Sequence, residues 1–316
     1  MNIKYRNYEP NDEHKICRLY RQVFNADMSY DFWQWRYQKN PFGNLNISLC
    51  FDGDRLVGHY AVSPINFICN GEIIKGAQSM TTMVDPEYQG LRIFSTLAEQ
   101  QYAKLTIEKY AFVWGFPNRN SYYGFIQHLN WHPVMEIPFL ICKTAKTEYE
   151  GSFKVTHSPP TESEIKNLMG FSSRAKSFEL HRTIDYISWR YDLHPKNKYE
   201  KRYFYEDGFL TGMIITKNYM VNGESYLDLL ELMAIDENYT KNILLWMRYY
   251  FLNIQNVKGI YAWSSIHDDN YLAYFQNGFL AQSPMTYLGA LSFHNSNIDQ
   301  FQPTKWVISM GDSDVF

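Results

Sequence analysis

The chain has 316 residues, a length typical of two domains of about 150 residues each. Its 30 basic and 33 acidic side chains give a formal net charge of −3, which disfavours a nucleic-acid binder, because such proteins usually carry a basic excess. No stretch approaches the roughly 18 apolar residues of a membrane span, and the N-terminal residues lack the apolar core of a signal peptide. The four scattered cysteines have neither zinc-ligand spacing nor the pattern of a disulfide framework. We therefore expect a cytoplasmic protein with no metal, no nucleic-acid partner and no membrane association.

In chain order, the first half predicts a strand, two helices, a meander of antiparallel strands, and then strand, helix, strand, helix and strand. Asn11 is a candidate N-cap for a helix over residues 12–24, and residues 30–38 predict a second helix. The later strands are expected over residues 47–51, 56–69, 73–84 and 111–116. Two further helices are expected over residues 93–104 and around residues 122–129.

The most informative stretch covers residues 83–97, where a strand turns tightly into a helix. The strand must end at Asp85-Pro86, because proline cannot continue a sheet ladder. Such a turn presents unpaired backbone N–H groups and the positive end of a helix dipole, which together can bind phosphate. Gly90 allows an anion to approach the backbone, and Arg92 adds a positive charge. An ordinary strand–turn–helix connection is the alternative interpretation.

This stretch resembles the pyrophosphate loop of the GCN5-related N-acetyltransferases, written Gln/Arg-x-x-Gly-x-Gly/Ala. Gln89 and Gly90 match the pattern, whereas Arg92 and Phe94 stand where small residues are usual. The resemblance implies acetyl-CoA as cosubstrate, with its pantetheine arm along the preceding strand. The implied coenzyme contacts are Met83, Val84, Gln89, Gly90, Leu91, Arg92, Ile93, Phe94, Ser95, Asn118 and Asn120. For the two asparagines, helix capping is the alternative.

The chain also matches itself at an offset of about 150 residues. The matching segments are 31–37 with 185–191, 70–72 with 222–224, and 111–114 with 260–263. We therefore predict an α/β (α+β) fold of two tandem acetyltransferase-like domains, residues 1–149 and 150–316, each a mixed, mostly antiparallel sheet flanked by helices. The second copy has acidic residues and no glycine at the position of the phosphate loop. We expect one coenzyme site, in the first copy, with the second helping to form the acceptor site.

Catalysis requires a group that protonates the departing thiolate and a group that takes a proton from the amine. In the family a tyrosine often protonates the thiolate, but that position is Ile126 here, so we predict Tyr123, with Tyr122 as the alternative. Tyr274 holds the equivalent position in the second copy and is interpreted as structural. The candidate bases are His59, Glu136 or a chain of waters.

The acceptor pocket is expected to lie beside the second helix and the strand before the loop. Its predicted residues are Trp33, Arg36, Tyr37 and Ser79. The Trp-Arg-Tyr motif recurs in the second copy, which lacks the loop, and this favours a packing or inter-domain role. The C-terminal residues include Asp312 and Asp314 after a predicted strand over residues 306–310, and with the Phe316 carboxylate they bring three negative charges. We favour a solvated acidic tail, with a tail held against the cleft as the alternative.

Together these patterns predict an acetyl-CoA-dependent N-acetyltransferase that works by direct attack in a ternary complex. The resemblance is strongest to duplicated enzymes that N-acetylate a nucleotide-linked amino sugar in bacterial polysaccharide (O-antigen or lipopolysaccharide) gene sets. A dTDP-3-amino-3,6-dideoxyhexose is the preferred acceptor. The alternatives are an aminoacyl- or aminoglycoside-type tandem transferase, and an inactive CoA-sensing or scaffold protein.

Overall fold

A computed structural model describes residues 1–43, 45–143, 147–172, 178–293 and 301–316. The first half follows the predicted order of elements. These elements are β1 (Ile3–Asn7), α1 (Glu13–Phe24), α2 (Tyr30–Tyr37), β2 (Asn46–Asp52), β3 (Arg55–Cys69), β4 (Glu72–Val84), α3 (Ile93–Ile107), β5 (Phe112–Gly115), α4 (Arg119–Tyr123) and β6 (His132–Cys142). Asn11 does not cap α1: it adopts a φ of 80°, and the N-cap position belongs to Asp12, whose carboxylate binds Arg6.

The second half repeats this order and adds two short strands, β8 and β14. Its elements are β7 (Lys154–Thr156), α5 (Glu162–Ser172), β8 (Phe178–Leu180), α6 (Ile184–Ile187), β9 (Glu200–Glu206), β10 (Phe209–Val221), β11 (Glu224–Ala234), α7 (Glu237–Met247), β12 (Ile260–Trp263), α8 (Tyr271–Gln276), β13 (Leu280–Ser292) and β14 (Trp306–Val307). The β3–β4 and β10–β11 hairpins both turn at Asn-Gly pairs with positive φ, as the sequence predicts.

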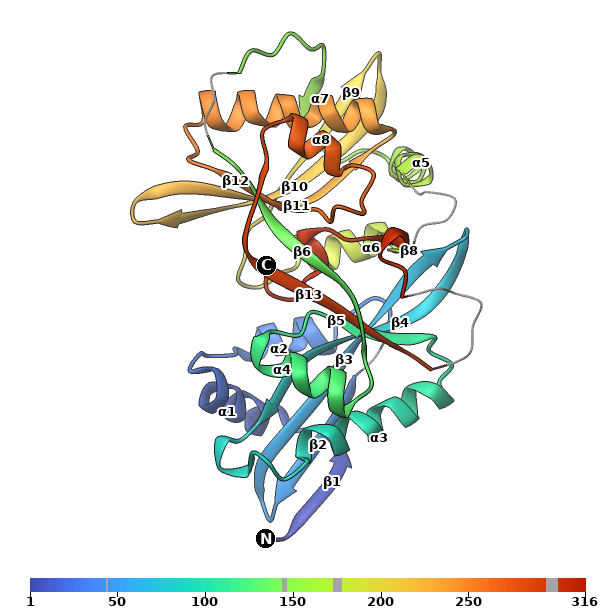
Figure 1. Ribbon diagram of the computed structural model, residues 1–316, viewed down its shortest axis with the longest axis vertical. Coiled ribbons are helices and arrows are strands. Elements are labelled where there is room, and N and C mark those ends of the chain that lie inside the picture. Colours follow the sequence, from blue (N-terminus) through green and yellow to red (C-terminus); the bar gives the residue numbers. More distant parts are fainter. Residues whose placement is uncertain (44, 144–146, 173–177, 294–300) are drawn as a thin grey trace.

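The described strands form one 14-stranded sheet, with the order β1-β2-β3-β4-β5-β13-β6-β12-β11-β10-β9-β7 along its main path. This order is symmetric about its centre, because each half contributes five outer strands and one of the two central strands. β13 from the second half pairs with β5, and β6 from the first half pairs with β12. Figure 1 shows β6 and β13 crossing the middle of the molecule side by side. The sheet therefore continues across the predicted boundary between residues 149 and 150.

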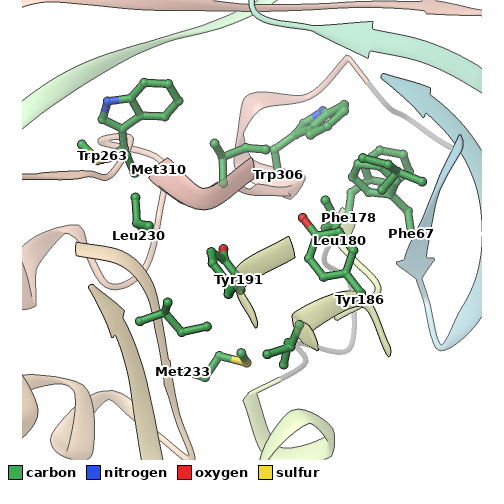
Figure 2. Close-up of a cluster of buried hydrophobic side chains, with 14 of the residues drawn as sticks. Phe67, Phe178, Leu180, Tyr186, Tyr191, Leu230, Met233, Trp263, Trp306 and Met310 are labelled. Carbon is green, nitrogen blue, oxygen red and sulfur yellow. The ribbon is translucent and has the colours of Figure 1, made fainter. Parts of the chain in front are cut away.

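The two Trp-Arg-Tyr motifs pack against each other between the halves. Trp35 Nε1 donates to the Trp189 carbonyl at 2.7 Å, and Trp189 Nε1 donates to the Trp35 carbonyl at 2.8 Å. Their rings stack with centroids 5.1 Å apart. Side chains from both halves form a core around this contact, and Figure 2 shows part of that core. For these tryptophans, the predicted packing role is confirmed.

Candidate active site

The first half opens a gap between two parallel strands. β4 pairs with β5 only over residues 76–78, opposite residues 112–114; β5 then ends at Gly115 while β4 continues to Val84. Before that end, β4 carries a bulge at which Thr81 takes a φ of 50°. Met83 and Val84 lie beyond the bulge, where β4 has β3 as its partner but no partner strand on the β5 side among the described residues. An extended ligand can hydrogen-bond to this edge as an added strand would.

The loop after β4 is fixed by a buried carboxylate. Asp85 is fully buried, accepts from the Glu87 amide at 3.1 Å and forms an ion pair with Arg55 at 2.6 Å. Tyr88 donates to Asp52 at 2.8 Å and anchors the next turn. These contacts fix the position of the turn that leads into residues Gln89 to Ser95.

The start of α3 is suited to an anion. Gly90 and Arg92 have φ values of 80° and 59°, and α3 begins directly after Arg92. No side chain caps this end of the helix, and its first turn holds no acidic residue. A side chain added at Gly90 would meet no protein atom within 4 Å, so the loop faces open space. Backbone amides, the helix dipole and an exposed arginine therefore converge there.

Both departures from the family pattern keep the loop geometry. Arg92 adopts the left-handed conformation that a glycine would supply. Phe94 packs edge-on against Phe125, with centroids 5.1 Å apart, and its ring lies where a side chain on Gly124 would approach to 3.0 Å. A glycine on the neighbouring helix thus makes room for the larger residue at position 94.

The equivalent helix of the second half is closed to an anion. The side chain of Asp236 caps α7 by accepting from the Tyr239 amide at 3.0 Å, and Glu237 adds a second charge in the first turn. A carboxylate at a helix N-terminus takes the place an anionic ligand would occupy. This contrast supports the prediction of one coenzyme site, in the first half.

Asn118 caps a helix, which is the alternative role that its sequence position allowed. Its side chain accepts from the amides of Asn120 and Ser121 at 2.9 and 3.0 Å, which starts α4. Asn118 and Asn120 are exposed, and their contact with pantetheine stays a prediction.

The predicted acid Tyr123 lies on α4, and the predicted base Glu136 lies on a strand distant from that of His59. Tyr123 is 65% exposed with its ring against His128, whereas Tyr122 packs on Tyr287 of β13 at 4.8 Å between centroids. Exposed Glu136 is the cross-strand partner of Tyr287, so Tyr122 and Glu136 lie close to one another. β4, β5 and β13 separate β6, which carries Glu136, from β3, which carries His59.

His59 is fully buried and oriented by the bulge. Its Nδ1 donates to the Thr81 carbonyl at 2.8 Å, so Nε2 carries the lone pair, and this atom has no hydrogen-bond partner among the described residues. Burial lowers the pKa of His59 to about 4, which keeps the ring neutral at pH 7. The geometry supports a role in positioning the bulge, and proton abstraction by His59 stays a prediction.

The other predicted acceptor residues divide between the core and the β4 surface. Trp33 is fully buried in the core beneath α1 and α2, which places its ring out of reach of an acceptor and corrects that prediction. Tyr37 is also buried, with its ring 6.1 Å from that of His59. Ser79 is half-buried on β4.

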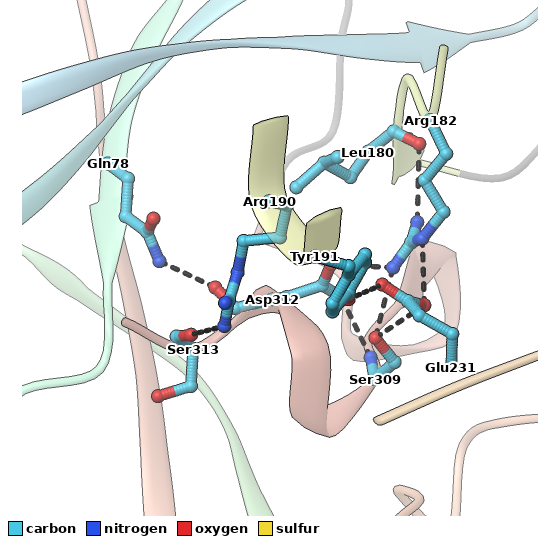
Figure 3. A network of polar contacts seen from close by, with 9 residues as sticks. All are labelled: Gln78, Leu180, Arg182, Arg190, Tyr191, Glu231, Ser309, Asp312 and Ser313. Carbon is cyan, nitrogen blue, oxygen red and sulfur yellow. Dashed lines mark hydrogen bonds and ion pairs between the residues drawn. The ribbon is translucent and has the colours of Figure 1, made fainter. Parts of the chain in front are cut away.

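Residues 311–313 of the C-terminal segment are buried and the segment is held by arginines from both halves, which contradicts the favoured prediction of a solvated tail, although Val315 is exposed. Arg36 Nη2 donates to the Asp314 carbonyl at 2.9 Å, and its counterpart Arg190 donates to the carbonyls of Ser313 and Phe316 at 3.1 and 2.7 Å. The duplicated arginines thus bind one shared segment. On the first-half side, Gln78 of β4 donates to the Asp312 carbonyl at 2.7 Å (Figure 3).

Asp312 belongs to a buried charge network that sequence reasoning missed. Arg182 contacts its carboxylate at 2.5 Å and Glu231 at 2.9 Å, and Tyr191 donates to Glu231 at 2.6 Å (Figure 3). Burial of two carboxylates around one guanidinium raises the pKa of Asp312 to about 6. The repeated Trp-Arg-Tyr motif gave a signal for Arg36 and Arg190, which bind the same segment, but no motif in the sequence marked Arg182 or Glu231.

Comparison with known proteins agrees with this geometry. A family model described as an acetyltransferase (GNAT) domain matches residues 4–134. No protein of curated function matches the sequence. None of the described helices has the length and apolar character needed to cross a membrane.

Solved structures share the whole fold at low identity. A probable N-acyltransferase from Enterococcus faecalis is 15% identical with a TM-score of 0.72, over 92% of this chain and 72% of that one. A GCN5-related N-acetyltransferase from Anabaena variabilis is 13% identical with a TM-score of 0.71, over 92% and 73%. Saccharomyces cerevisiae N-myristoyltransferase with bound myristoyl-CoA is 9% identical with a TM-score of 0.62, over 97% and 84%.

The match to the family model supports an acetyltransferase (GNAT) domain over residues 4–134 and an N-acetyltransferase as the class of enzyme. The solved structures share the fold. The predicted mixed α/β fold is confirmed.

Proposed function

We propose that the chain transfers an acetyl group from acetyl-CoA, bound in the first half, to the amino group of a small molecule. The observation that carries this proposal is the combination of the β4–β5 gap with the uncapped start of α3. The β4 edge at Met83 and Val84 would pair with the pantetheine arm, and residues 89–95 would hold the pyrophosphate. The bound thioester supplies the activated acetyl group.

The acceptor would approach β4 from the side of α2 and the C-terminal segment. On that side Arg36 lies 3.5 Å from the Met80 sulfur and 3.8 Å from the Asp314 carboxylate, which is 29% exposed. A carboxylate there can attract and orient a cationic amine. The second half would help to form this acceptor site, because the segment is held by Arg190 as well as by Arg36.

In the transfer, the amine nitrogen bonds to the acetyl carbon while the carbon–sulfur bond breaks. The proton lost by the amine goes to His59, to Glu136 or to water, and the thiolate receives a proton from Tyr123 or Tyr122. We propose a nucleotide-linked amino sugar as acceptor, with a dTDP-3-amino-3,6-dideoxyhexose first. Its support is the family resemblance alone. Asn118 and Gly311 add nothing to it, because Asn118 caps a helix and Gly311 packs against Tyr191.

Thermal denaturation with ligands tests the proposal, because a ligand that binds the native state raises the melting temperature. Acetyl-CoA and the dTDP-sugar should both stabilise an enzyme. Stabilisation by CoA species alone would indicate a sensor. If neither ligand stabilises the protein, a scaffold is indicated. Myristoyl-CoA, the ligand of the yeast neighbour, tests the length of the acyl group. Thiol release over a panel of amines then identifies the acceptor.

A pair of matched variants tests the choice of half. Gly90→Val places a branched side chain at a φ of 80° in the space before α3, and should raise the acetyl-CoA KM about tenfold or more. Lys241→Ala, at the equivalent helix of the second half, removes only an ion pair with Glu237 and should leave the KM unchanged. The reverse result would place the coenzyme in the second half.

A further inference from the structure

A chain of hydrogen bonds runs through the core of the first half and ends on β4. Trp131 Nε1 donates to the Tyr102 hydroxyl at 2.9 Å, and the hydroxyls of Tyr102 and Tyr60 are 2.9 Å apart. All three side chains are buried. Burial raises the pKa of Tyr60, and side-chain hydrogen bonds with Ser79 and Tyr102 offset part of this rise. Ser79 is therefore the β4 end of the chain.

Ser79 lies on the same face of the sheet as this chain. Its partner on β3 is Val62, and Tyr60 is two residues before Val62, so the three side chains share one face. Met80 points to the opposite face, where it contacts Arg36. The proposed acceptor would approach on the Met80 face, so Ser79 faces away from the attacking amine.

The hydrogen bonds of the chain have a fixed direction. The Trp131 indole is a donor only, so the Tyr102 oxygen accepts from it. The Tyr102 proton is then directed to Tyr60, and the Tyr60 proton to Ser79, because buried hydroxyl protons are normally paired and these are the remaining partners among the described residues. The Ser79 oxygen thus accepts from Tyr60 and keeps its own proton for a group outside the chain. Ser79 is half-buried, so this end of the chain is accessible.

Ser79 also lies where the gap between β4 and β5 begins. The two strands pair as far as Gln78 and Trp114, and Ser79 is the next residue of β4. A side chain added at Gly115, the last residue of β5, would lie 3.0 Å from the Ser79 carbonyl. Val84 is about 15 Å further along β4 at the usual rise of a strand. A pantetheine arm that starts at residues 89–95 and follows this edge would bring its thioester to Ser79.

We propose that the Ser79 hydroxyl donates a hydrogen bond to the thioester sulfur as it leaves, and that Tyr60, Tyr102 and Trp131 position this hydroxyl. The inference rests on the proposed binding of acetyl-CoA in the first half. Ser79 would be a catalytic residue because it touches the departing sulfur, whereas the other three are positioning residues.

The hydrogen bond would act on charge that develops during the transfer. When the amine nitrogen bonds to the acetyl carbon, the electron pair of the carbon–sulfur bond passes to the sulfur. A donor that is already oriented stabilises this charge without reorganising. A thiol ionises near pH 8.5, so the sulfur can leave as a thiolate while the proton stays on Ser79. Protonation by Tyr123, Tyr122 or water can then follow.

Calorimetric titration with CoA and desulfo-CoA tests the proposal without knowledge of the acceptor. Desulfo-CoA lacks the sulfur but keeps the phosphates, so the ratio of the two affinities reports on the thiol group alone. A hydrogen bond to a charged group is worth about tenfold or more in affinity. Between about pH 6 and pH 9 the affinity for CoA relative to desulfo-CoA should therefore rise about tenfold or more, because the thiolate is preferred to the thiol.

Variants assign this preference to the chain. In Ser79→Ala the rise with pH should fall below about twofold, and Ser79→Thr, which keeps the hydroxyl, should restore it. Tyr60→Phe and Tyr102→Phe should each reduce the rise about threefold, because the chain no longer orients Ser79. Ser48→Ala is the matched control: it removes another buried hydroxyl beneath α3, paired with Gln101 at 2.9 Å, and should leave the rise unchanged. If a tyrosine variant fails to fold, the half-buried Ser79→Ala decides.

The outcomes separate this inference from the proposed function. Binding of CoA and desulfo-CoA with an affinity ratio that does not change with pH would overturn the role of Ser79 and leave the transferase function standing. An unchanged rise in a folded Ser79→Ala protein would do the same. If neither ligand binds, the proposed function fails and the inference fails with it. An unchanged rise in both Tyr60→Phe and Tyr102→Phe would overturn the positioning role of the chain.

Discussion

Replacing Arg92 by glycine should separate coenzyme binding from stability. Arg92 has a φ of 59°, a conformation that costs an L-residue about 1–2 kcal/mol and costs glycine nothing. Glycine loses about 0.5–1 kcal/mol through its greater freedom in the unfolded chain. Because the Arg92 side chain is exposed, its removal sacrifices little packing. The Arg92→Gly protein should therefore be about 0.5–1 kcal/mol more stable than the wild type.

The same substitution removes the positive charge that would face the pyrophosphate of acetyl-CoA in the proposed site. A hydrogen bond to a charged group is worth about 1.5–3 kcal/mol, so the acetyl-CoA KM should rise roughly tenfold to hundredfold. Urea denaturation and steady-state kinetics measure the two effects on one preparation. Arg92→Lys is the matched control: it keeps both the strain and the charge, so its stability should equal that of the wild type. A less stable Arg92→Gly protein, or one with an unchanged KM, would refute the reasoning.

Three other predictions concern the interior. If His59 takes the amine proton, His59→Asn should lower turnover by roughly 10²–10⁴ and remove the acid limb of the pH–rate profile; a small loss would indicate positioning alone, since asparagine can still donate to the Thr81 carbonyl. Burial raises the pKa of Asp312 to about 6, so protonation of this carboxyl stabilises the folded protein. This stabilisation is fully present below about pH 4 and is lost as the pH rises through 6. The urea midpoint of the wild type should fall over this range, whereas the midpoint of Asp312→Asn should not show this change. Trp35→Phe and Trp189→Phe should each cost about 1–3 kcal/mol in denaturant unfolding, by leaving a buried carbonyl without its donor, and a double variant should be less than additive because the two rings are in contact.

The order of elements could be predicted because the sequence states it twice. Each strand and helix pattern in the first half has a counterpart in the second, and both Asn-Gly turns adopt the expected positive φ values. The exchange of β6 and β13 could not be predicted. Either strand presents the same apolar alternation to its own half or to the other, so local pattern does not determine which partner it pairs with.

The charged C-terminal residues show the limit of reading charge along a sequence. A short acidic run at a chain end usually lies in water, and residues 312–316 fit that pattern. Their partners Arg36, Arg182 and Arg190 lie more than a hundred residues away in the sequence, so no local spacing indicates the pairing. The predicted strand over residues 306–310 is realised only as β14, because a 3-10 turn at Met310–Asp312 follows and directs the segment between the halves.

The two halves show how one scaffold can keep or lose an anion site. Both keep a pair of parallel strands that separate beside a helix N-terminus. In the first half Gly90 and Arg92 leave that terminus uncapped and positive, whereas in the second Asp236 caps it. Changing Asp236 to glycine would therefore not by itself create a second coenzyme site, because Glu237 would still place a negative charge in the first turn of α7. The turn before the helix and the first turn of the helix together decide whether each half can accept an anion at this position.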